Sequence, residues 1–451
     1  MTQPTFFGDD ASLAPPPPNP APLGTPRLRT VQRHQSELRC ASLDQLLPPD
    51  HEVRGIWAYV EGLDLAPLRR SIKAVAGQAG RDANDPRVLF ALWLYAIFKG
   101  IGSARELDRL CQEHLAYQWL CGGMTVNYHS LADFRVNHLD VLDQLLTDSV
   151  ATLLHQGLVE LQRVAQDGLK VRASAGAASF RREPSLQACL QEAQQQVAAL
   201  QEPGGDASRR QQAARQRAAE ERVLRVQHAL AERQQLLELR QQQQHDKGTK
   251  FQPEQLRTST TDPEARRMKM ADGGTRPAYN VQFATTTGSG LIVGVDVTTS
   301  GGDGGQLAPM LEQLRERYQQ LPTAMLVDGG FTTLADIDTA HAQGVQVYGP
   351  LKEEAKQLAD GKDPYQPKKK DGPGVAAWRQ RMGTAAAKAI YRERAATAEW
   401  TNAGARNRGL YQVRVRGESK VLAVVLLYAL VHNLLRAQAL RTATGEPKPR
   451  C

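Results

Sequence analysis

The order of apolar runs in the second half of the chain constrains the fold more than any other feature. Five short runs have the apolar character of strands, and they lie at 161–175, 279–287, 291–300, 323–331 and 345–351. Amphipathic helical segments lie before and after the fourth run. Three strands that can pair as a meander, followed by alternating helices and strands, predict a mixed sheet flanked by helices. The expected class is therefore α/β, with a sheet domain over residues 159–436.

A long insertion interrupts this domain between its first and second strands. Residues 184–250 are rich in Gln, Arg, Glu and Ala, and apolar residues recur there at steps of three and four. The sequence Glu-Pro-Gly-Gly-Asp at 202–206 divides the pattern into two arms. The segment predicts an antiparallel helical hairpin. Such a hairpin could pair two protomers, contact DNA or serve as a solvated insert, and the sequence does not choose among these roles.

The first third of the chain has a different, helical pattern. Residues 1–41 are rich in Pro and predict a disordered tail. From 42 to 158, apolar residues recur at three- and four-residue steps, and Asp85 and Ser103 stand where helix N-caps belong. This part of the chain is therefore expected to form an all-α N-terminal domain of several short helices.

The C-terminal part contains one strongly apolar stretch at 421–435. It is too short to span a bilayer and carries His432 and Asn433, so we expect a buried helix and no membrane partner. Residues 437–451 predict a flexible tail. The five cysteines are scattered without the spacing of a zinc site or a disulfide framework, and the start of the chain lacks a signal-peptide pattern. A cytoplasmic location is therefore expected.

The charge balance is moderately basic, with 56 Lys and Arg against 48 Asp and Glu and a net charge of +8. This balance is compatible with a nucleic-acid partner, although ribosomal and membrane-surface proteins share it. Short helices joined by Gly turns can form a helix-turn-helix, which places one helix in the DNA major groove. Residues 103–120 are the best candidate for that helix, because Arg105 and Arg109 fall on one face. The alternative is that both arginines only solvate an amphipathic helix.

Three carboxylates stand at positions that suit phosphoryl transfer. Asp167 lies in the first strand, Asp328 ends the fourth, and Glu399 lies in a later segment with a helical pattern. Carboxylate oxygens are the ligands that Mg²⁺ prefers. Two such ions, roughly 4 Å apart, can activate an attacking oxygen and stabilise a leaving one. The pattern predicts a metal-dependent site that acts on nucleic acid, although Asp-Gly, as at 328–329, is also a common turn dipeptide.

Four other carboxylates compete for roles in this site. Glu393 is an alternative to Glu399, and Asp262 could approach the metals from before the second strand. Asp296 lies in the third strand, which we expect at the sheet edge, away from the first and fourth strands. Asp303 is expected to cap the helix that begins near Gly305.

The order of these pieces resembles a known family. Residues 261–314, followed by Leu-Val-Asp-Gly-Gly-Phe, are similar to the catalytic domain of bacterial insertion-sequence transposases of the IS-four/IS-five superfamily. The resemblance is to the branch with a helical N-terminal domain and an insertion after the first strand. It covers roughly 42–436 and is most specific over 261–331. It implies an RNase H-like fold, a DDE triad and an N-terminal domain that binds the terminal inverted repeats of the element.

The family motifs map onto this sequence residue by residue. The two aspartates of the triad fall on Asp167 and Asp328. The late motif of the family is a tyrosine, an arginine three residues later and then a glutamate, with a basic residue two turns further on; its counterparts here are Tyr391, Arg394, Glu399 and Arg406. The chain departs from the family at Leu169, where Thr is frequent, and at Trp400, where many relatives have Pro.

The resemblance implies a DDE transposase with two Mg²⁺ ions, for which Mn²⁺ can substitute, held by Asp167, Asp328 and Glu399. Arg392, Arg394 and Arg406 suit phosphate contacts beside the scissile bond, or else form a solvated helix face. The expected partners are double-stranded DNA of the element ends and the target, and a second protomer or more, at the nucleoid in the cytoplasm. Two alternatives stay open: an RNase H-like nuclease that cuts without joining, and a catalytically inactive DNA-binding protein derived from a transposase.

Overall fold

The computed structural model describes residues 33–34, 36, 40–70, 72–75, 77, 79, 82–201, 209–248 and 251–443. The chain divides into two units, Met1–Ser42 and Leu43–Cys451, and every element described below belongs to the second. The Pro-rich tail expected over 1–41 lies almost wholly outside the described residues.

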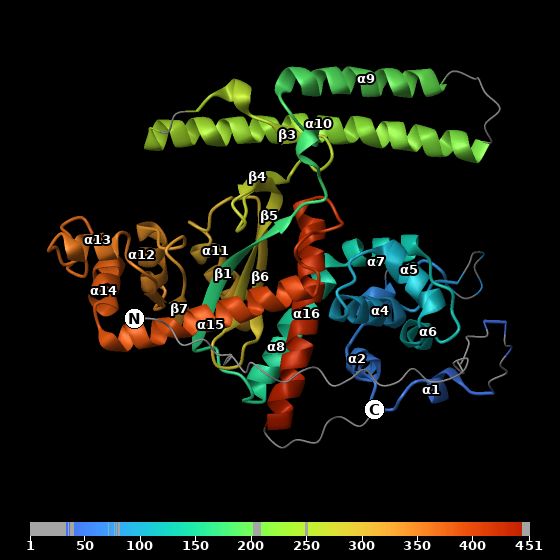
Figure 1. Cartoon of the computed structure of the whole chain (residues 1–451), viewed down its shortest axis with the longest axis horizontal. Helices are drawn as coiled ribbons and strands as arrows, with labels where there is room; N and C mark the ends of the chain where they lie inside the picture. Colours follow the sequence, from blue (N-terminus) through green and yellow to red (C-terminus); the bar gives the residue numbers. More distant parts are fainter. Residues whose placement is uncertain are drawn as a thin grey trace, which may run out of the picture. The chain divides into compact units, whose positions relative to one another are not determined.

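A mixed sheet forms the centre of the second half of the chain (Figure 1). Its strands are β1 (Arg163–Arg172), β4 (Arg266–Lys269), β5 (Thr275–Thr286), β6 (Ile292–Thr298), β7 (Ala324–Leu326) and β8 (Gln346–Tyr348). The hydrogen-bonded order is β4-β5-β1-β7-β8, and β6 pairs with β5 alone. Strands β1, β7 and β8 run parallel, whereas β5 is antiparallel to β1 and β6 is antiparallel to β5. The predicted mixed sheet, a meander followed by alternating helices and strands, is confirmed, and the sheet is RNase H-like.

Helices cover both faces of this sheet, which is why β5 is almost entirely buried. On the face to which Asp167 points lie α15 (Ala385–Asn407), which packs on β1 and β5, and α16 (Glu418–Ala443), which packs on β6. On the other face lie α11 (Leu307–Tyr318) and α12 (Leu334–Ala342), which contact β6 and β8 respectively. Two further helices, α13 (Glu354–Ala359) and α14 (Pro373–Met382), follow β8, and α14 packs on α12.

The residues before the sheet form the expected set of short helices. They are α1 (Leu43–Leu46), α2 (Glu52–Glu61), α3 (Ala66–Arg70), α4 (Pro86–Phe98), α5 (Ala104–Glu113), α6 (Leu115–Cys121), α7 (Tyr128–Asn137) and α8 (Leu139–His155). Asp85 and Ser103 cap α4 and α5 through their side chains, as predicted. Helix α16 packs on α4, α7 and α8 as well as on β6, so the helical region and the sheet share one hydrophobic core.

The candidate recognition helix over 103–120 is two helices and not one. His114 ends α5 and begins α6 with an extended backbone (φ −118°, ψ 125°), and its Nδ1 accepts a hydrogen bond from the backbone N–H of Ala116 at 3.3 Å. The break turns α6 so that Tyr117 and Leu120 are buried in the core. The arginines at 105 and 109 remain together on the exposed side of α5.

The C-terminal helix is longer than its apolar stretch. Helix α16 continues to Ala443, so the expectation of a flexible tail from residue 437 is wrong for 437–443. Ala437 and Leu440 pack against a small apolar cluster around Leu291, which extends the helix past the strongly apolar run. This helix is long and apolar enough to cross a membrane by composition, but 67% of its most apolar window is buried inside the protein. It therefore has the character of a core helix, as predicted.

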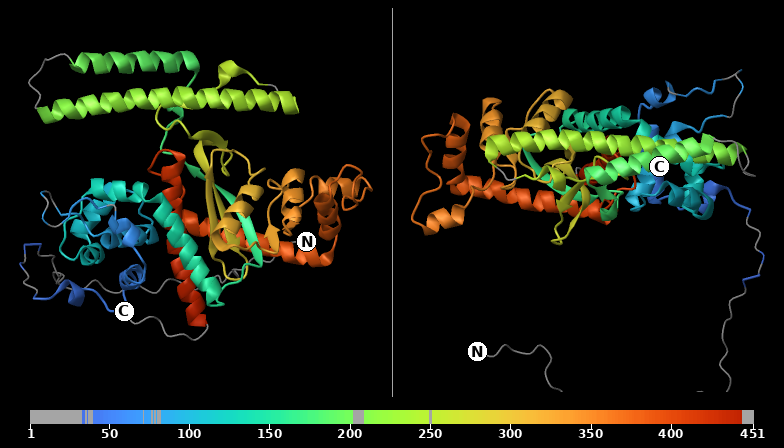
Figure 2. Two further views of the ribbon diagram at one scale, coloured as in Figure 1. Left: turned by 180° about the vertical axis from the view of Figure 1, so that it is seen from behind. Right: turned by 90° about the horizontal axis from the view of Figure 1, so that it is seen from above.

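The insertion after β1 is a pair of helices. Helices α9 (Glu183–Gln201) and α10 (Arg209–Lys247) lie side by side in both orientations of Figure 2. A two-stranded sheet of β2 (Phe180–Arg181) and β3 (Thr258–Ser259) closes its base. Small and apolar residues of both arms are buried, among them Leu186, Ala193 and Val226, so the predicted hairpin is confirmed.

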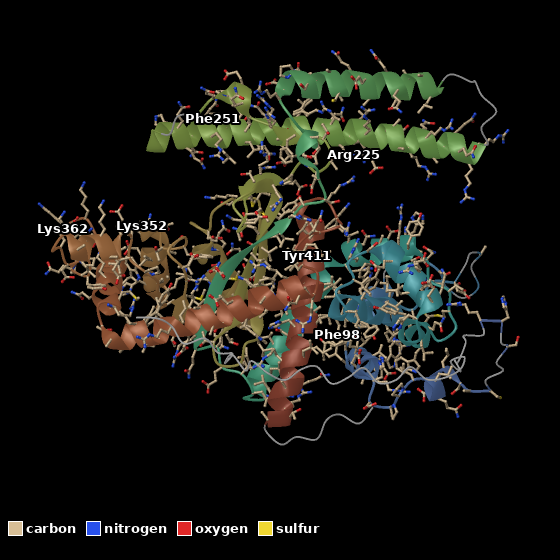
Figure 3. All side chains as sticks on the ribbon, viewed as in Figure 1. Phe98, Arg225, Phe251, Lys352, Lys362 and Tyr411 are labelled. Carbon is tan, nitrogen blue, oxygen red and sulfur yellow. The ribbon has the colours of Figure 1, made fainter. Side chains whose placement is uncertain are left out.

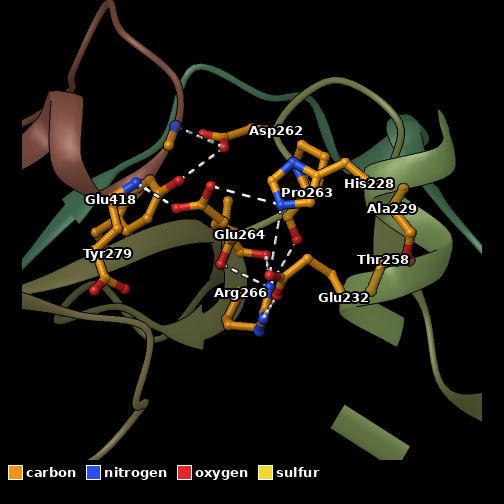
Figure 4. A network of polar contacts seen from close by, with 12 residues as sticks. His228, Ala229, Glu232, Thr258, Asp262, Pro263, Glu264, Arg266, Tyr279 and Glu418 are labelled. Atoms are coloured by element: carbon orange, nitrogen blue, oxygen red, sulfur yellow. Dashed lines mark hydrogen bonds and ion pairs between the residues drawn. The ribbon is translucent and has the colours of Figure 1, made fainter. Parts of the chain in front are cut away.

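A polar network joins the insertion to the sheet and to the start of α16 (Figure 4). Arg266 of β4 pairs with Glu232 of α10 at 2.5 Å. The carboxylate of Glu264 accepts a hydrogen bond from the backbone N–H of Glu418 at 2.6 Å, and His228 of α10 lies 3.8 Å from the same carboxylate. These contacts connect three parts of the chain that are far apart in sequence.

The carboxyl group of Glu418 is expected to make stability depend on pH. Burial raises its pKa to about 7, and the carboxylate of Glu264 adds to the effect. Asp296 and Glu232 act in the same direction, whereas Arg266 opposes them. Because the folded state holds this proton more tightly than the unfolded state, its contribution is present at low pH and is lost between the ordinary value of 4.5 and about 7.

We therefore expect Glu418→Gln to flatten the pH dependence of stability. Relative to the wild type, the free energy of unfolding of the variant should rise as the pH increases from 5 to 8, in urea titrations at both values. Glu316→Gln on the exposed side of α11 is the matched control. If the free energies of unfolding of variant and wild type differ by the same amount at pH 5 and pH 8, Glu418 is not the source of this pH dependence.

Candidate active site

Strand register brings the first two candidate aspartates together. Ala165 of β1 pairs with Leu326 of β7 in parallel. Asp167 and Asp328 each follow this pair by two residues, so both lie at the same level where β7 ends. Carboxyl ends of parallel strands are where open α/β sheets place their sites. The two side chains line one open cavity of about 520 Å³.

A single guanidinium links the two carboxylates. Nη2 of Arg394, on α15, donates to Oδ1 of Asp167 at 2.7 Å and lies 3.7 Å from Oδ2 of Asp328. Nδ2 of Asn402, two turns further along α15, donates to Oδ2 of Asp167 at 2.8 Å. Both oxygens of Asp167 are therefore held by α15, which fixes the orientation of this carboxylate.

Asp167 lies in an environment that disfavours its charge. Burial raises the pKa of its carboxyl group, and the guanidinium of Arg394 opposes this effect. The carboxylates of Asp328 and Asp303 raise the pKa further. The surroundings of Asp167 therefore favour its neutral form over the carboxylate.

Asp328 combines a turn with an open carboxylate oxygen. Its Oδ1 accepts a hydrogen bond from the backbone N–H of Gly330 at 2.7 Å, which closes an Asx turn. Its Oδ2 lies toward Arg394 and the cavity. The turn role that Asp-Gly suggests and a role in the site are therefore compatible in this residue.

The prediction that Asp303 caps α11 is wrong. Asp303 does not cap this helix, whose N-cap residue is Gln306 without a side-chain hydrogen bond. Oδ1 of Asp303 accepts hydrogen bonds from Nδ2 of Asn280 and Nε2 of Gln282, both at 2.8 Å, and its side chain lines the cavity with Asp167 and Asp328. Two amides of β5, which are distant in sequence, bind this carboxylate in place of the first turn of α11.

The other carboxylates considered from the sequence do not line this cavity. Glu393 pairs with Arg163 and accepts a hydrogen bond from the hydroxyl of Thr287, at the opposite end of β1. Asp296 lies on β6, the edge strand, as predicted. Asp262 is fully buried in the network of Figure 4, where Tyr279 donates to it at 2.7 Å, and it does not line the cavity of Asp167 and Asp328.

Glu399 is not brought into contact with the two aspartates. Its side chain is exposed, and within the described residues it has no hydrogen bond or ion pair. Its position on α15 nevertheless matches the site, because Glu399, Asn402 and Arg406 follow one another at i, i+3 and i+7. These residues share one side of the helix, and Arg406 lines the cavity.

The remaining candidates of the late motif divide into two groups. Tyr391 is half-buried, and burial raises the pKa of its phenol, with Asp328 and Asp167 adding to the effect. Arg392 points to solvent and makes no contact with the site within the described part of the chain.

The rim of the cavity is basic, and sequence reasoning missed most of it. Lys170 and Arg172 continue β1 past Asp167, while Lys269 and Arg276 come from β4 and β5. Tyr411, labelled in Figure 3, adds an aromatic ring that is 55% exposed. The alternation of basic residues along Gly168-Leu169-Lys170-Val171-Arg172 is the sequence pattern that could have revealed this rim.

The two arginines of α5 proposed for DNA contact are exposed, and each contacts one neighbouring side chain. The guanidinium of Arg105 lies 5.3 Å from the centre of the Tyr128 ring on α7. Arg109 pairs with Glu113 at 2.7 Å along the same helix. Both side chains are exposed, so a polyanion can reach them.

Comparison with protein families identifies two parts of the chain. Residues 41–137 match the model described as "Transposase domain (DUF772)", and residues 242–434 match the model described as "Transposase DDE domain". No curated protein and no solved structure matches the chain. The second match includes Asp328 and Glu399 but begins at residue 242, near the end of α10, so Asp167 on β1 lies outside it. Together the two matches cover well over half of the 451 residues, and the chain belongs to the DDE transposases of insertion sequences.

Proposed function

We propose that this transposase nicks DNA at the ends of its insertion sequence and joins the freed 3′-hydroxyl to target DNA. The observation that carries the proposal is the shared cavity of Asp167 and Asp328, with Arg394 between them and a basic rim around them. A basic rim suits the phosphates of DNA, and carboxylates at its centre suit divalent cations. The protein is also proposed to belong to the IS-four/IS-five branch of these transposases.

The donor set fits hard divalent cations. Besides the two carboxylates, Oδ1 of Asn402 and Oδ1 of Asn280 are buried oxygen atoms without a hydrogen-bond partner in the described structure. Within the same residues, however, no three acidic, His or Cys side chains stand close enough to hold one ion. Asp167 and Asp328 would hold the ions, and Arg394 would have to withdraw from the space between them. Two Mg²⁺ ions, with Mn²⁺ as a substitute, would supply activation of the attacking oxygen and charge for the leaving one.

The residues of α15 would position the reacting phosphate. Asn402 holds the carboxylate of Asp167 in place. Arg394 and Arg406 would neutralise the phosphate oxygens as charge develops, because guanidinium binds phosphate bidentately. The phenol of Tyr391 and the guanidinium of Arg392 are proposed to contact the DNA backbone near the scissile bond.

Glu399 is proposed as the third member of the triad. It lies on the same side of α15 as Asn402 and Arg406, one turn and two turns away from them. A change of side-chain rotamer, or a small rotation of α15, would turn its carboxylate toward Asp167. Binding of a cation between Glu399 and Asp167 would favour this inward orientation. Without the cation, the Glu399 carboxylate is better solvated by water.

The N-terminal helices are proposed to bind the terminal inverted repeats. We propose the divisions 42–158 for this domain and 159–436 for the catalytic domain, with the 184–250 hairpin inserted into the latter. Two ends must be paired before joining, so the protein is proposed to act as a dimer or larger assembly on DNA. Its place would be the nucleoid, in the cytoplasm.

The two α5 arginines give a test of this DNA interface. Arg105→Ala and Arg109→Ala are each expected to weaken binding to DNA of the element ends. Because each would remove one phosphate contact, the slope of log affinity against log salt should fall by about 1. Arg315→Ala on α11 removes one positive charge elsewhere and is the control. Equal salt slopes for all four proteins, in fluorescence anisotropy, would place the DNA contact outside α5.

A direct test of the function uses DNA from both flanks of the gene, incubated with the purified protein and Mg²⁺ or Mn²⁺. The proposal expects cleavage at defined ends, followed by joining to a target plasmid. Cleavage without joined products would favour an RNase H-like nuclease. Binding of the ends without cleavage would favour a DNA-binding remnant of a transposase.

A further inference from the structure

We propose that Asp303 is a further metal-binding residue of this active site, one that supplies a carboxylate oxygen beside Asp328. This inference rests on the proposed function, because it assigns an additional ligand to the cations of that site. Asp303 comes from the loop between β6 and α11 and lies outside the late motif on α15. Residues of β1 and β5 determine the position of its carboxylate.

The first observation is the space that Gly168 leaves beside Asp167. A Cβ atom at Gly168 would lie 2.3 Å from Oδ1 of Asp303, closer than real contacts allow. It would also lie 2.8 Å from Oδ1 of Asn280 and 2.9 Å from Nε2 of Gln282. The glycine after Asp167 therefore allows the Asp303 carboxylate to lie directly against β1.

The second observation is that buried amides orient this carboxylate. Asn280 and Gln282 of β5 are almost completely inaccessible to solvent, and both donate to Oδ1 of Asp303. With Oδ1 held twice, Oδ2 is left for another partner. A Cβ at Gly330, two residues after Asp328, would lie 3.6 Å from this Oδ2. The free oxygen therefore lies on the Asp328 side of the cavity.

The third observation is an oxygen without a partner. Oδ1 of Asn280 is fully buried, accepts no hydrogen bond among the described residues, and faces the same space above Gly168. A buried amide oxygen without a partner is costly unless a donor or cation satisfies it. Carboxylate and amide oxygens that converge on one place are the ligand types of Mg²⁺ and Mn²⁺.

The test measures Mn²⁺ binding by the full-length protein, from the electron paramagnetic resonance of free Mn²⁺. Asp303→Asn removes the charge but keeps an oxygen for Asn280 and Gln282, so the fold should be retained. We expect its affinity for Mn²⁺ to fall about 10-fold to 100-fold. Gly168→Ala, which displaces Asp303 without removing a charge, should weaken binding in the same direction. Asp296→Asn, on the neighbouring edge strand, should bind as the wild type does.

The outcomes separate this inference from the proposed function. Wild-type binding of Mn²⁺ together with unchanged binding by Asp303→Asn would overturn the role of Asp303 alone. A wild-type protein that binds no Mn²⁺, with or without DNA of the element ends, would overturn the proposed metal chemistry and this inference together. Thermal melting of each variant, compared with the wild type, shows whether weaker binding comes from unfolding.

Discussion

Asp167→Asn and Asp328→Asn are each expected to lower the rate of DNA cleavage by about 10³-fold or more. Loss of one charged group that stabilises phosphoryl transfer has effects of this size. Both substitutions keep the size of the side chain, and Asn at 328 can still accept the hydrogen bond that closes the turn to Gly330. DNA binding should therefore be retained, and a gel assay of labelled element ends measures binding and cleavage on the same substrate.

The control for these variants is an aspartate in the same sheet but outside the cavity. Asp296→Asn on β6 changes the same functional groups at a position that pairs only with β5. It should cleave at the wild-type rate. Cleavage by Asp167→Asn or Asp328→Asn at a rate within a few-fold of this control would remove these carboxylates from the chemistry.

Asn433→Ala is expected to lower the stability of this fold strongly. Asn433 on α16 is buried and forms two hydrogen bonds with Ile292 on the edge strand β6, accepting from its N–H at 2.8 Å and donating to its C=O at 2.7 Å. The side chain thus takes the place of a neighbouring strand. Its loss leaves two buried backbone groups unpaired, and we expect a decrease of about 3 kcal/mol in the free energy of unfolding.

The same edge strand contains a matched control. Gln313 on α11 makes the same pair of bonds with Val295, at 2.9 Å and 2.8 Å, but its side chain is only half-buried. Water can replace the amide there, so Gln313→Ala should cost about 1 kcal/mol. Urea unfolding of both variants measures the difference. If both variants lose the same free energy of unfolding, the buried hydrogen bonds of Asn433 do not stabilise the edge of β6 more than those of Gln313.

The sheet and the meeting of Asp167 with Asp328 could be predicted because both follow from local pattern and topology. Short apolar runs marked the strands, and their order favoured a meander followed by alternating helices and strands in one mixed sheet. Once β1 and β7 pair in parallel, two residues at equal distance after the pair must lie at the same level of the sheet. The family resemblance then implied metal-dependent phosphoryl transfer for these two aspartates.

The role of Asp303 could not be predicted, because its partners lie far away in sequence. Asp before a helix is a common capping pattern, and locally nothing distinguishes Asp303 from such a cap. Asn280 and Gln282 precede it by 23 and 21 residues, and Gly168 lies further still. Only the three-dimensional pairing of β1 with β5 brings these groups to one place.

The predicted ends of two helices were wrong for a similar reason. The periodicity of 103–120 fits one helix, but burial of Tyr117 and Leu120 requires a break at His114. At the other end of the chain, packing of Ala437 and Leu440 extends α16 beyond its strongly apolar run. In both places tertiary packing outweighs the local pattern, which is the usual limit of propensity.

The position of Glu399 stays a prediction, since its carboxylate is exposed and the cations proposed to attract it act only when bound. Mn²⁺ titration of Glu399→Gln, beside the exposed Glu316→Gln as control, would measure whether it contributes to binding. We expect weaker binding for the first variant alone.

The most direct test of the central claim uses a pre-cut element end, labelled on its 5′ side, with supercoiled target plasmid, Mg²⁺ and the purified protein. If this site performs strand transfer, an end with a 3′-hydroxyl will be joined to the plasmid, and the same end with a 3′-deoxy terminus will not. Asp328→Asn will join neither. Failure of the wild-type protein to join the hydroxyl end, although it binds that end, would contradict the claim.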